Sequence, residues 1–395
     1  MAPDLGMGAL DALLASARRE CSFLRRSPWD LALVSWVPWL LVIVVLFVLS
    51  AGLLRDVPIA VVDEDHSSAS RALIRKLEAA PGIHVKAMPE SLDRAWPLVR
   101  QLDVFAVAYI PRDASRRIGR GDSATLFAFY NASYLTAGQA ASREIGAAVQ
   151  AQNAESSFAR GAYLRGRSGL RAVPVRVQST ILFNAERNYE HFLGGLLLPA
   201  ILLLAMCLAV VAAFGRELRD GTAGAWLDGC RQRFVAAALG KLAPYLLLFT
   251  AYGALAIVWI ACLRGNGVAG SFAVLVAGYA GVFLAYSAIG LLLLGLTRNM
   301  GTALSLSGMY AGVSLAFSGG TFPVIEGPLF TQVWSKLLPY TAYVELQMQQ
   351  LDMGSPLRVS ARPLLTMLLF IVVAGVPALR LFGRAARDPA CWGRR

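Results

Sequence analysis

Long uncharged stretches divide the chain into two membrane regions that are separated by a mostly polar segment. The first apolar run covers residues 31–54, and the others follow between residues 191 and 382. A helix needs about 20 apolar residues to cross a bilayer, because each backbone polar group in lipid must be hydrogen-bonded within the helix. The pattern therefore predicts six membrane-spanning helices. They are expected at 31–54, 191–214, 242–263, 268–297, 299–320 and 363–382.

The polar segment, residues 55–190, alternates between the patterns of strands and helices. Short apolar runs predict strands at 57–63, 83–86, 104–110 and 125–130. Helical periodicity predicts helices at 67–80, 90–100 and 134–165. Such alternation is typical of a small sheet covered by helices. The predicted fold is a polytopic α-helical membrane protein with six transmembrane helices, one plus five, and an α/β domain inserted between helices 1 and 2.

Residues 1–30, before the first span, have an amphipathic pattern. Six apolar residues recur at helical spacing, namely Leu10, Leu13, Leu14, Ala17, Cys21 and Leu24. Four arginines lie in the second half of this segment. A helix that lies on the inner surface of a membrane has this pattern. The alternative is an ordinary helix packed on a cytoplasmic partner, and the adjacent span favours the surface helix.

The charge distribution predicts the orientation of these elements. The chain has 37 Lys and Arg against 25 Asp and Glu, a net charge of +12, and 56% hydrophobic residues. With the N-terminus inside, fifteen basic residues lie in cytoplasmic segments, including a basic tail at 383–395, and four lie in short external segments. Basic residues of short loops favour the cytoplasmic side. We therefore expect both termini in the cytoplasm and an extracytoplasmic domain at 55–190. The expected location of the whole protein is a bacterial inner membrane.

The sequence indicates no enzyme. Three histidines and five cysteines are scattered without metal-ligand spacing, so no metal or cofactor is expected. Gly240 and Lys241 lack the upstream glycine and the following hydroxyl of a phosphate-binding loop, which excludes ATP hydrolysis by such a loop. Nucleic-acid binding would need basic runs interleaved with aromatics, and the sequence has none. Asp63, Glu64 and Asp65 suit either a cation or, more commonly, the N-terminus of a helix.

The predicted cytoplasmic loop, residues 215–241, carries the most specific motifs. It begins with GRELRDGT, and its end joins GKLAPY. These motifs resemble the R-E-x-x-x-G-T and G-K-x-x-P-Y signatures of type 2 permeases of ATP-binding-cassette (ABC) exporters. The segments VPIAVVDEDHSSASR from Val57, SGGTFP from Ser318 and LPY from Leu338 resemble other parts of that family. The matches together cover most of the chain, and the arrangement of one plus five spans agrees.

In that family the loop after the second span forms a coupling helix, which is seated in a groove of a separate ATPase subunit. The resemblance implies that five residues lie at or near this contact, namely Arg216, Glu217, Gly221, Thr222 and Leu227. A charged loop can form paired contacts that reorganise when the ATPase dimer closes. The alternative is that Arg216 and Glu217 only extend to the membrane surface. With the coupling role, Glu217→Lys is expected to leave the fold intact and to abolish export.

The chain departs from the family pattern at three positions. Gly224 stands where a glutamate is common, Cys230 where a proline is common, and Ala185 where a proline often enters the second span. The strength of coupling and the identity of the partner are therefore left open. A degenerate half of a heterodimer would show such changes.

The fifth span contains closely spaced small residues. Gly308 and Gly312 form a GxxxG motif, which Gly301 and Ser305 extend. Small residues let helices approach closely, either in a dimer or within one subunit. Spans two and five line the substrate path in the resembled family, so polar residues of span five are candidates to face that path. The candidates are Ser307, Tyr310 and Ser314.

These features together predict the permease subunit of an ATP-driven ABC exporter, with ATP and magnesium bound by a separate cytoplasmic subunit. The resemblance allows amphiphilic drugs or lipid-linked molecules as substrates. Further expected partners are membrane lipid and a second copy or a sibling permease, and the size of the external domain suits a periplasmic adaptor protein. No predicted span has an acidic residue at its centre, which disfavours a proton relay. The alternative is a membrane receptor or scaffold whose external domain binds a ligand or an adaptor.

Overall fold

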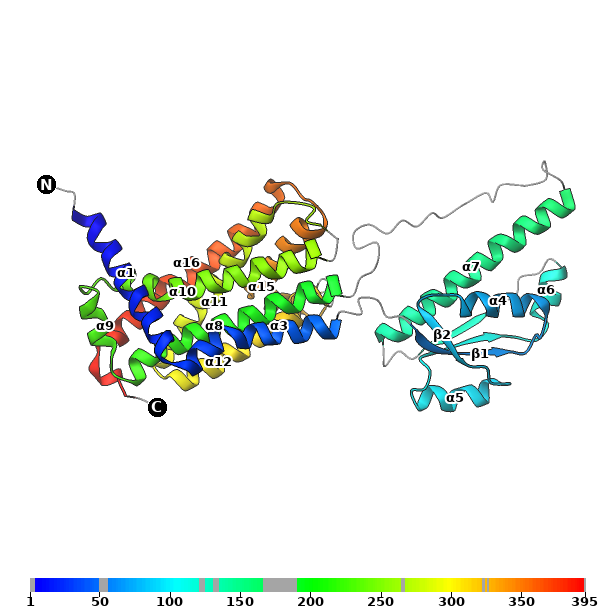
Figure 1. The fold of residues 1–395 in the computed structure, drawn as a ribbon, viewed down its shortest axis with the longest axis horizontal. Helices are drawn as coiled ribbons and strands as arrows, with labels where there is room; N and C mark the ends of the chain where they lie inside the picture. The colour runs from blue at the N-terminus through cyan, green and yellow to red at the C-terminus, as the bar shows by residue number, and fades with distance from the viewer. Residues whose placement is uncertain are drawn as a thin grey trace. The chain divides into compact units, whose positions relative to one another are not determined.

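The chain folds into two compact units (Figure 1). Residues 1–50 and 182–395 form the membrane unit, and residues 51–181 form the insert unit. The computed structural model describes residues 4–49, 56–120, 125–130, 135–165, 190–263, 267–321, 324 and 327–393. Ala185, one of the departures from the family pattern, lies outside these residues.

The insert unit contains a four-stranded sheet with the strand order β2-β1-β3-β4. β1 pairs in parallel with β2 and β3, and β4 pairs with β3 in antiparallel orientation. The strands are β1 (Val57–Asp63), β2 (Ile83–Ala87), β3 (Ala106–Ile110) and β4 (Phe127–Tyr130). The helices are α4 (Ser68–Glu78), α5 (Leu92–Arg100), α6 (Ala114–Arg120) and α7 (Leu135–Arg165). The predicted strands and helices are present, and α4 and α5 supply the crossovers that parallel strands need.

Helices cover both faces of this sheet. β1 buries Ile59 and Val61 on one face and Ala60 and Val62 on the other, because successive side chains of a strand point to opposite faces. The first pair packs in a core with α4 and α7, and the second pair packs in a smaller core with α5. α6 was not predicted, because its sequence ASRRIGR has no apolar periodicity.

The acidic residues after β1 form local hydrogen bonds. Asp63 accepts bonds from the backbone N–H groups of Asp65 and His66 at 3.0 and 3.1 Å, and from the Ser70 hydroxyl in the first turn of α4. Asp65 accepts a bond from the backbone N–H of Ser115 at 3.2 Å. These contacts favour the helix-terminus interpretation of the acidic residues. Among the described residues, no group of three or more His, Cys, Asp or Glu could hold a metal ion.

The described part of the membrane unit has six helices that are long and apolar enough to cross a membrane. They are Pro28–Val48, His191–Arg219, Phe234–Ala261, Phe272–Thr297, Met300–Phe317 and Leu357–Arg387. Their number agrees with the six predicted spans, although their ends shift. The second span continues past its predicted end at 214 to Arg219, because the charged side chains of its last turns are paired with neighbouring helices.

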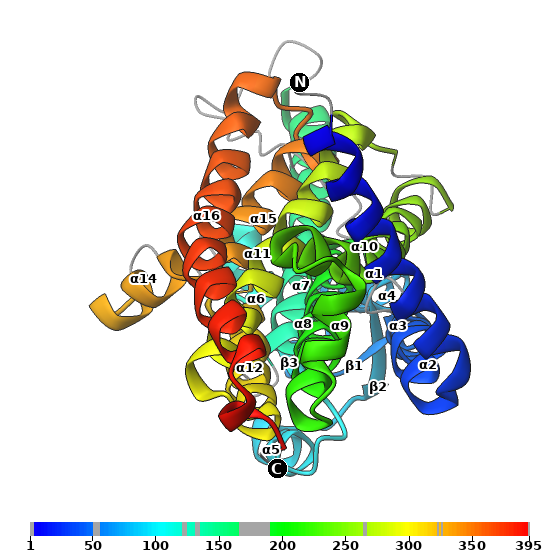
Figure 2. The ribbon, with the colours of Figure 1, turned by 90° about the vertical axis from the view of Figure 1, so that its left-hand side faces the viewer.

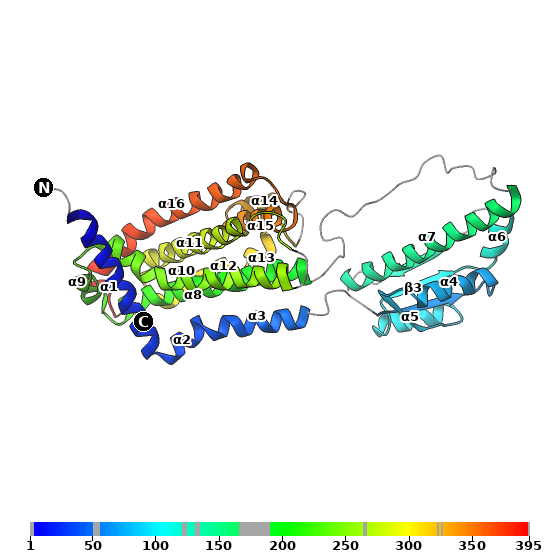
Figure 3. The same cartoon turned by 45° about the horizontal axis from the view of Figure 1, so that its top comes forward.

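The membrane unit consists of these spans, some of them divided into shorter elements, and of the shorter helices between them. Before the insert lie α1 (Asp4–Arg26), α2 (Pro28–Val34) and α3 (Trp36–Leu49). After the insert follow η3 (Glu190–Gly194), α8 (Gly195–Arg219), α9 (Ala223–Gly229), α10 (Phe234–Ile257), η4 (Val258–Leu263) and α11 (Phe272–Thr297). The last elements are α12 (Met300–Gly312), α13 (Ser314–Phe317), α14 (Leu329–Lys336), α15 (Pro339–Gln347), η5 (Met348–Asp352), α16 (Leu357–Arg387) and η6 (Pro389–Cys391). α3 runs beside α8 in the bundle (Figure 3).

The predicted external loop, residues 321–362, is not simply a loop, because it contains α14, α15 and η5. Tyr340 and Tyr343 of α15 are fully buried in the bundle. Gln347 donates a hydrogen bond to the carbonyl of Gly195 at 2.7 Å, and Tyr340 donates one to the carbonyl of Leu196. α15 has nine residues, which is too short for a membrane span, so hydropathy alone could not separate it from a loop.

α1 docks along α10, but the side of α1 that is buried there is not the predicted apolar stripe. The buried positions of α1 recur every four residues and are Ala12, Ser16, Glu20 and Leu24. By contrast, Leu10 is 57% exposed and Leu14 is 41% exposed. Leu10, Leu14 and Cys21 of the stripe are thus exposed, while two polar residues, Ser16 and Glu20, face inward.

Candidate functional site

The second span ends in a tight turn that reverses the chain into α9. Gly221 has a φ of +67°, a left-handed conformation that glycine adopts without a Cβ clash. The N–H of Gly221 bonds to the carbonyl of Leu218 at 3.4 Å, and the N–H of Thr222 bonds to the carbonyl of Glu217 at 3.0 Å. These bonds form a Schellman motif. We call residues 215–241 the elbow, and this end of the membrane unit the elbow end (Figure 2).

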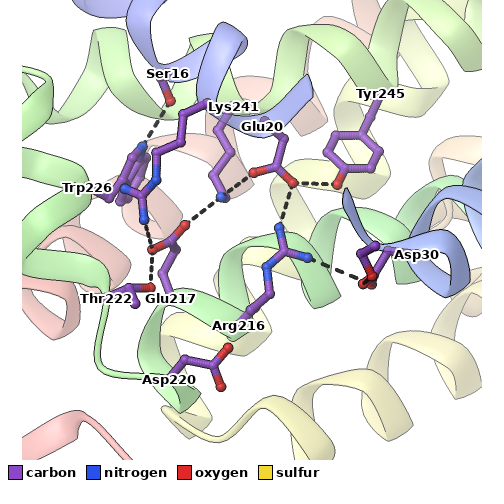
Figure 4. A network of polar contacts seen from close by, with 12 residues as sticks. Ser16, Glu20, Asp30, Arg216, Glu217, Asp220, Thr222, Trp226, Lys241 and Tyr245 are labelled. Carbon is purple, nitrogen blue, oxygen red and sulfur yellow. Dashed lines mark hydrogen bonds and ion pairs between the residues drawn. The ribbon is translucent and has the colours of Figure 1, made fainter. Parts of the chain in front are cut away.

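Four charged side chains from three helices meet beside the elbow (Figure 4). Lys241 of α10 pairs with Glu20 of α1, and its Nζ lies 2.8 Å from Glu217 Oε1 of α8. Arg216 Nη2 donates a hydrogen bond to Glu20 Oε1 at 2.7 Å. The exposed fraction is 1% for Glu20 and Lys241, 3% for Glu217 and 8% for Arg216. We call these four residues the buried ion cluster.

Neutral groups add further hydrogen bonds to both carboxylates. The Tyr245 hydroxyl donates to Glu20 Oε1 at 2.6 Å, and the Thr222 hydroxyl donates to Glu217 Oε2. One turn along α1, the Ser16 hydroxyl donates to the carbonyl of Ala237 at 2.7 Å. Trp226 of α9 donates its indole N–H to the Ser16 oxygen at 2.9 Å. This second set of bonds ties α9 to α1 and α10 independently of the charges.

The cluster has a partly exposed rim of opposite charges and an aromatic wall. Arg19 lies 3.1 Å from Glu217, and its side chain is 40% exposed. Asp30 lies 3.8 Å from Arg216, and its side chain is 37% exposed. The guanidinium carbon of Arg216 lies 3.5 Å from the centre of the Phe23 ring, which adds a cation–π contact. Water therefore reaches the rim, whereas the four central side chains are excluded from it.

The balance of two carboxylates and two cations keeps the cluster ionised. Burial alone would raise the pKa of the Glu20 carboxyl, but the Lys241 ammonium and the Arg216 guanidinium outweigh burial and hold this pKa below its ordinary value. A buried pair of this kind adds little net stability compared with apolar residues, but removing one partner leaves a charge without compensation. The cluster therefore resists any motion that would separate α1, α8 and α10 at the elbow.

The structure brings the predicted coupling residues together but does not expose most of them. Arg216 and Glu217 belong to the last turns of α8 and point into the cluster, so neither simply extends to the membrane surface. Leu227 is 1% exposed, Thr222 is half-buried, and Gly221 is exposed. The burial also changes one expectation. Glu217→Lys would place another cation beside Arg216 and Lys241 and would destabilise the fold, so it cannot isolate a coupling defect.

Sequence reasoning did not assign a role to three residues of the site. Lys241 and Tyr245 were part of the G-K-x-x-P-Y motif, but their partners were not evident from the sequence. Glu20 was missed because it lies in another segment, 221 positions from Lys241. One signal was present: Ser16 and Glu20 are polar residues spaced four apart on an otherwise amphipathic helix, so they share one face.

The small residues of the fifth span lie mostly on an exposed side of α12. Gly301, Ser305 and Gly312 are exposed. Gly308 is half-buried, and a Cβ added there would lie 3.7 Å from a side-chain carbon of Leu208. The opposite side of α12 packs into the bundle. Within the described unit the GxxxG motif therefore does little to bring helices of this subunit together.

The residues predicted for a substrate path are buried or half-buried within the subunit, and two of them form hydrogen bonds there. Ser307 is 1% exposed, and Ser314 is fully buried and hydrogen-bonded to the Tyr286 hydroxyl. Tyr310 is half-buried and donates a hydrogen bond to the carbonyl of Leu337 at 2.6 Å. In this conformation the serines face neighbouring helices, and their role in a path stays a prediction.

Comparison with protein families identifies the membrane architecture. The sequence model described as ABC-2 family transporter protein matches residues 28–380, which include the insert unit, the elbow and most of the membrane unit. The chain belongs to this family. A comparison with curated proteins gave no match. ABC-2 membrane domains are permease components that work with an ATP-binding subunit, so the chain is a multi-pass membrane protein and the permease part of an ABC transporter.

Proposed function

We propose that this ABC-2 protein is the permease subunit of an ATP-driven exporter and that its elbow is the coupling site for the ATP-binding subunit. The observation that carries the proposal is the buried ion cluster, which joins the elbow to α1 and α10. A force applied to α9 would move the elbow, α1 and α10 together, because separating them would leave buried charges without their partners. Force from a partner could thereby reach the spans.

The proposed contact surface is the exposed side of α9 and its flanking turns. Gly221, Ala225, Asp228 and Gly229 are exposed, whereas Trp226 points inward to Ser16. Arg216 and Glu217 then act as positioning residues, since they hold α9 in place from behind. This assignment refines the expectation that these two residues contact the ATPase themselves.

The proposed orientation places the elbow, α1 and both termini in the cytoplasm of a bacterial cell, with the chain in the inner membrane. It follows from the arginines at the elbow end, since basic residues in short loops favour the cytoplasmic side. The insert unit would then be extracytoplasmic and could dock a periplasmic adaptor. For the substrate we propose a small amphiphilic molecule, a drug or a lipid-linked compound, because the spans offer an apolar route without acidic residues at their centres.

Co-purification in mild detergent tests the coupling site. Wild-type chain from its native host should retain an ATP-binding subunit, and Ala225→Trp should lose it because the bulky indole disturbs the contact surface. Ala151→Trp is the matched control, since Ala151 is exposed on α7 of the insert unit. Retention of the subunit by Ala225→Trp at the control level would contradict the coupling site. Absence of any ATPase from cross-linked wild-type protein would favour the receptor or scaffold alternative.

We also propose that two permease copies pack along the exposed side of α12. Gly312→Leu tests this contact, because an added Cβ at Gly312 meets no atom within 4 Å inside the subunit. The dimer fraction, measured by mass photometry in detergent, should fall. Gly146→Leu on α7 is the control, because Gly146 likewise has no neighbour within 4 Å. An unchanged dimer fraction in Gly312→Leu would contradict this contact.

A further inference from the structure

A groove opens at the elbow end of the membrane unit. Its volume is about 870 Å³, and it lies between the N-terminal half of α1, the start of α10 and the end of α16. Leu10 and Leu13 of α1, Val235 and Leu239 of α10, and Leu379 of α16 form its apolar walls. The proposed coupling and the family assignment leave this groove without a function.

Four arginines also line this groove: Arg233, Arg380, Arg384 and Arg387. The last three recur at four- and three-residue spacing, which places them on one side of α16. Among the described lining residues none has a carboxylate. The nearest acidic residues along the chain are Asp11, beside Leu10, and Asp388, beside Arg387. Asp388 accepts a hydrogen bond from the backbone N–H of Ala390 at the start of η6. The groove therefore carries a concentrated positive charge that suits an anion.

The groove also lies at the level where lipid headgroups are expected. α10 begins at Phe234 and α16 ends at Arg387, so the arginines stand at the ends of two membrane spans. α16 has 31 residues and at about 1.5 Å per residue is longer than a hydrocarbon core of about 30 Å. Its last turns therefore extend into the interfacial layer, while the apolar walls continue along the lipid-facing sides of the spans.

We propose that this groove binds an anionic phospholipid of the leaflet at the elbow end. The arginines hold the phosphate group, and Leu10, Leu239 and Leu379 contact the upper part of an acyl chain. A free phosphate ion would use the arginines alone and would leave the apolar walls unfilled. Basic pockets between membrane helices are suited to acidic headgroups. Because α1 forms one wall, the bound lipid would also fasten α1 against the bundle, independently of the proposed ATPase contact.

Native mass spectrometry of the purified full-length chain tests this site with phosphatidylglycerol and phosphatidylcholine added in equal amounts. The wild type should retain phosphatidylglycerol preferentially. Arg380→Gln combined with Arg384→Gln should weaken its binding by about 30-fold, since each basic residue near a membrane surface contributes about five-fold. Leu239→Trp retains all four arginines but fills the apolar part of the groove, and it should lower retention as well. Unfolding temperatures in phosphatidylcholine confirm that each variant is folded.

Arg358→Gln combined with Arg362→Gln is the matched control, because both arginines are exposed at the opposite end of the same helix. The control should retain phosphatidylglycerol as the wild type does. An equal loss in the control, or equal retention of the two lipids by the wild type, would overturn the site. Displacement of phosphatidylglycerol by inorganic phosphate at equal concentration would also overturn it, since the ligand would then be a soluble anion. Unchanged retention in Leu239→Trp would count against the role of the apolar walls.

Discussion

Lys241 and Glu20 form an ion pair in which neither side chain is more than 2% exposed. The two residues are 221 positions apart in the chain, and the pair connects α10 to a helix that precedes the first span. Glu217 brings α8 into contact with the same ammonium group, so one lysine links three helices. The elbow is consequently held from its inner side by charge, whereas its outer side is exposed.

Lys241→Met is expected to destabilise the membrane unit by about 3–5 kcal/mol, because it leaves two buried carboxylates without their shared cation. The measurement is the free energy of unfolding in detergent. Lys336→Met, at an exposed lysine of α14, is the control and should change stability little. Equal stability of the two variants would show that the cluster is not excluded from water.

The stability of the protein should depend on pH through Glu20. The pKa of Glu20 is depressed in the folded state, so its contribution is fully present above the unfolded carboxyl pKa of about 4.3. It is lost as pH falls below that value and through the lower folded pKa. Unfolding temperatures measured between pH 3 and pH 7 should therefore fall more steeply at the acidic end for the wild type than for Glu20→Gln. Identical slopes would contradict the depressed pKa.

Gly240→Ala should separate α1 from α10. An added Cβ at Gly240 would lie 2.1 Å from the carbonyl oxygen of Leu13, a backbone atom that cannot move aside without shifting α1. We expect a loss of about 1–3 kcal/mol in the free energy of unfolding, as for overpacked cores. Gly375→Ala in α16 is the control, because its added Cβ would make an ordinary contact of 3.6 Å. A neutral result for Gly240→Ala would contradict the close docking of α1.

Gly224→Ala should displace the C-terminal tail. An added Cβ at Gly224 would lie 2.9 Å from the Trp392 ring. The docked tail also donates a hydrogen bond from the Gly393 N–H to the Leu218 carbonyl at 2.9 Å, and Arg298 contacts the Cys391 sulfur at 3.6 Å. Displacement would expose Cys391, which is 1% exposed when docked. Alkylation of Cys391, followed by peptide mass spectrometry, should therefore become faster.

The control for this experiment is Gly229→Ala, where an added Cβ meets no atom within 4 Å. Cys391 should react at the wild-type rate in this variant. Protection of Cys391 in Gly224→Ala would contradict the packing of Trp392 against α9. The same contact gives a physical reason for the departure from the family pattern at Gly224, because a glutamate there would collide with the docked tail.

The sequence by itself determined most of the secondary-structure elements of this protein, and it indicated the family to which the protein belongs. Membrane spans depend on the length of apolar runs, and the strands of the insert depend on short apolar runs between turns, so both are local properties. The motifs at 215–241 are also local, and they were sufficient to indicate the ABC permease family that the match over residues 28–380 confirms. Local patterns failed for α15, a short buried helix, and for the polar helix α6.

Only the tertiary structure decided which residues act together. The sequence placed Glu20 on a surface helix and Glu217 in an exposed loop, whereas the fold buries both beside Lys241. The fold likewise gathers Arg233, just before α10, and three arginines of α16 around a groove that α1 closes. Pairing between such distant residues depends on how whole helices dock, and no periodicity within one segment encodes that. A charged side chain on the surface has little effect on stability. Once it is buried away from water, the fold must keep its oppositely charged partners in contact with it.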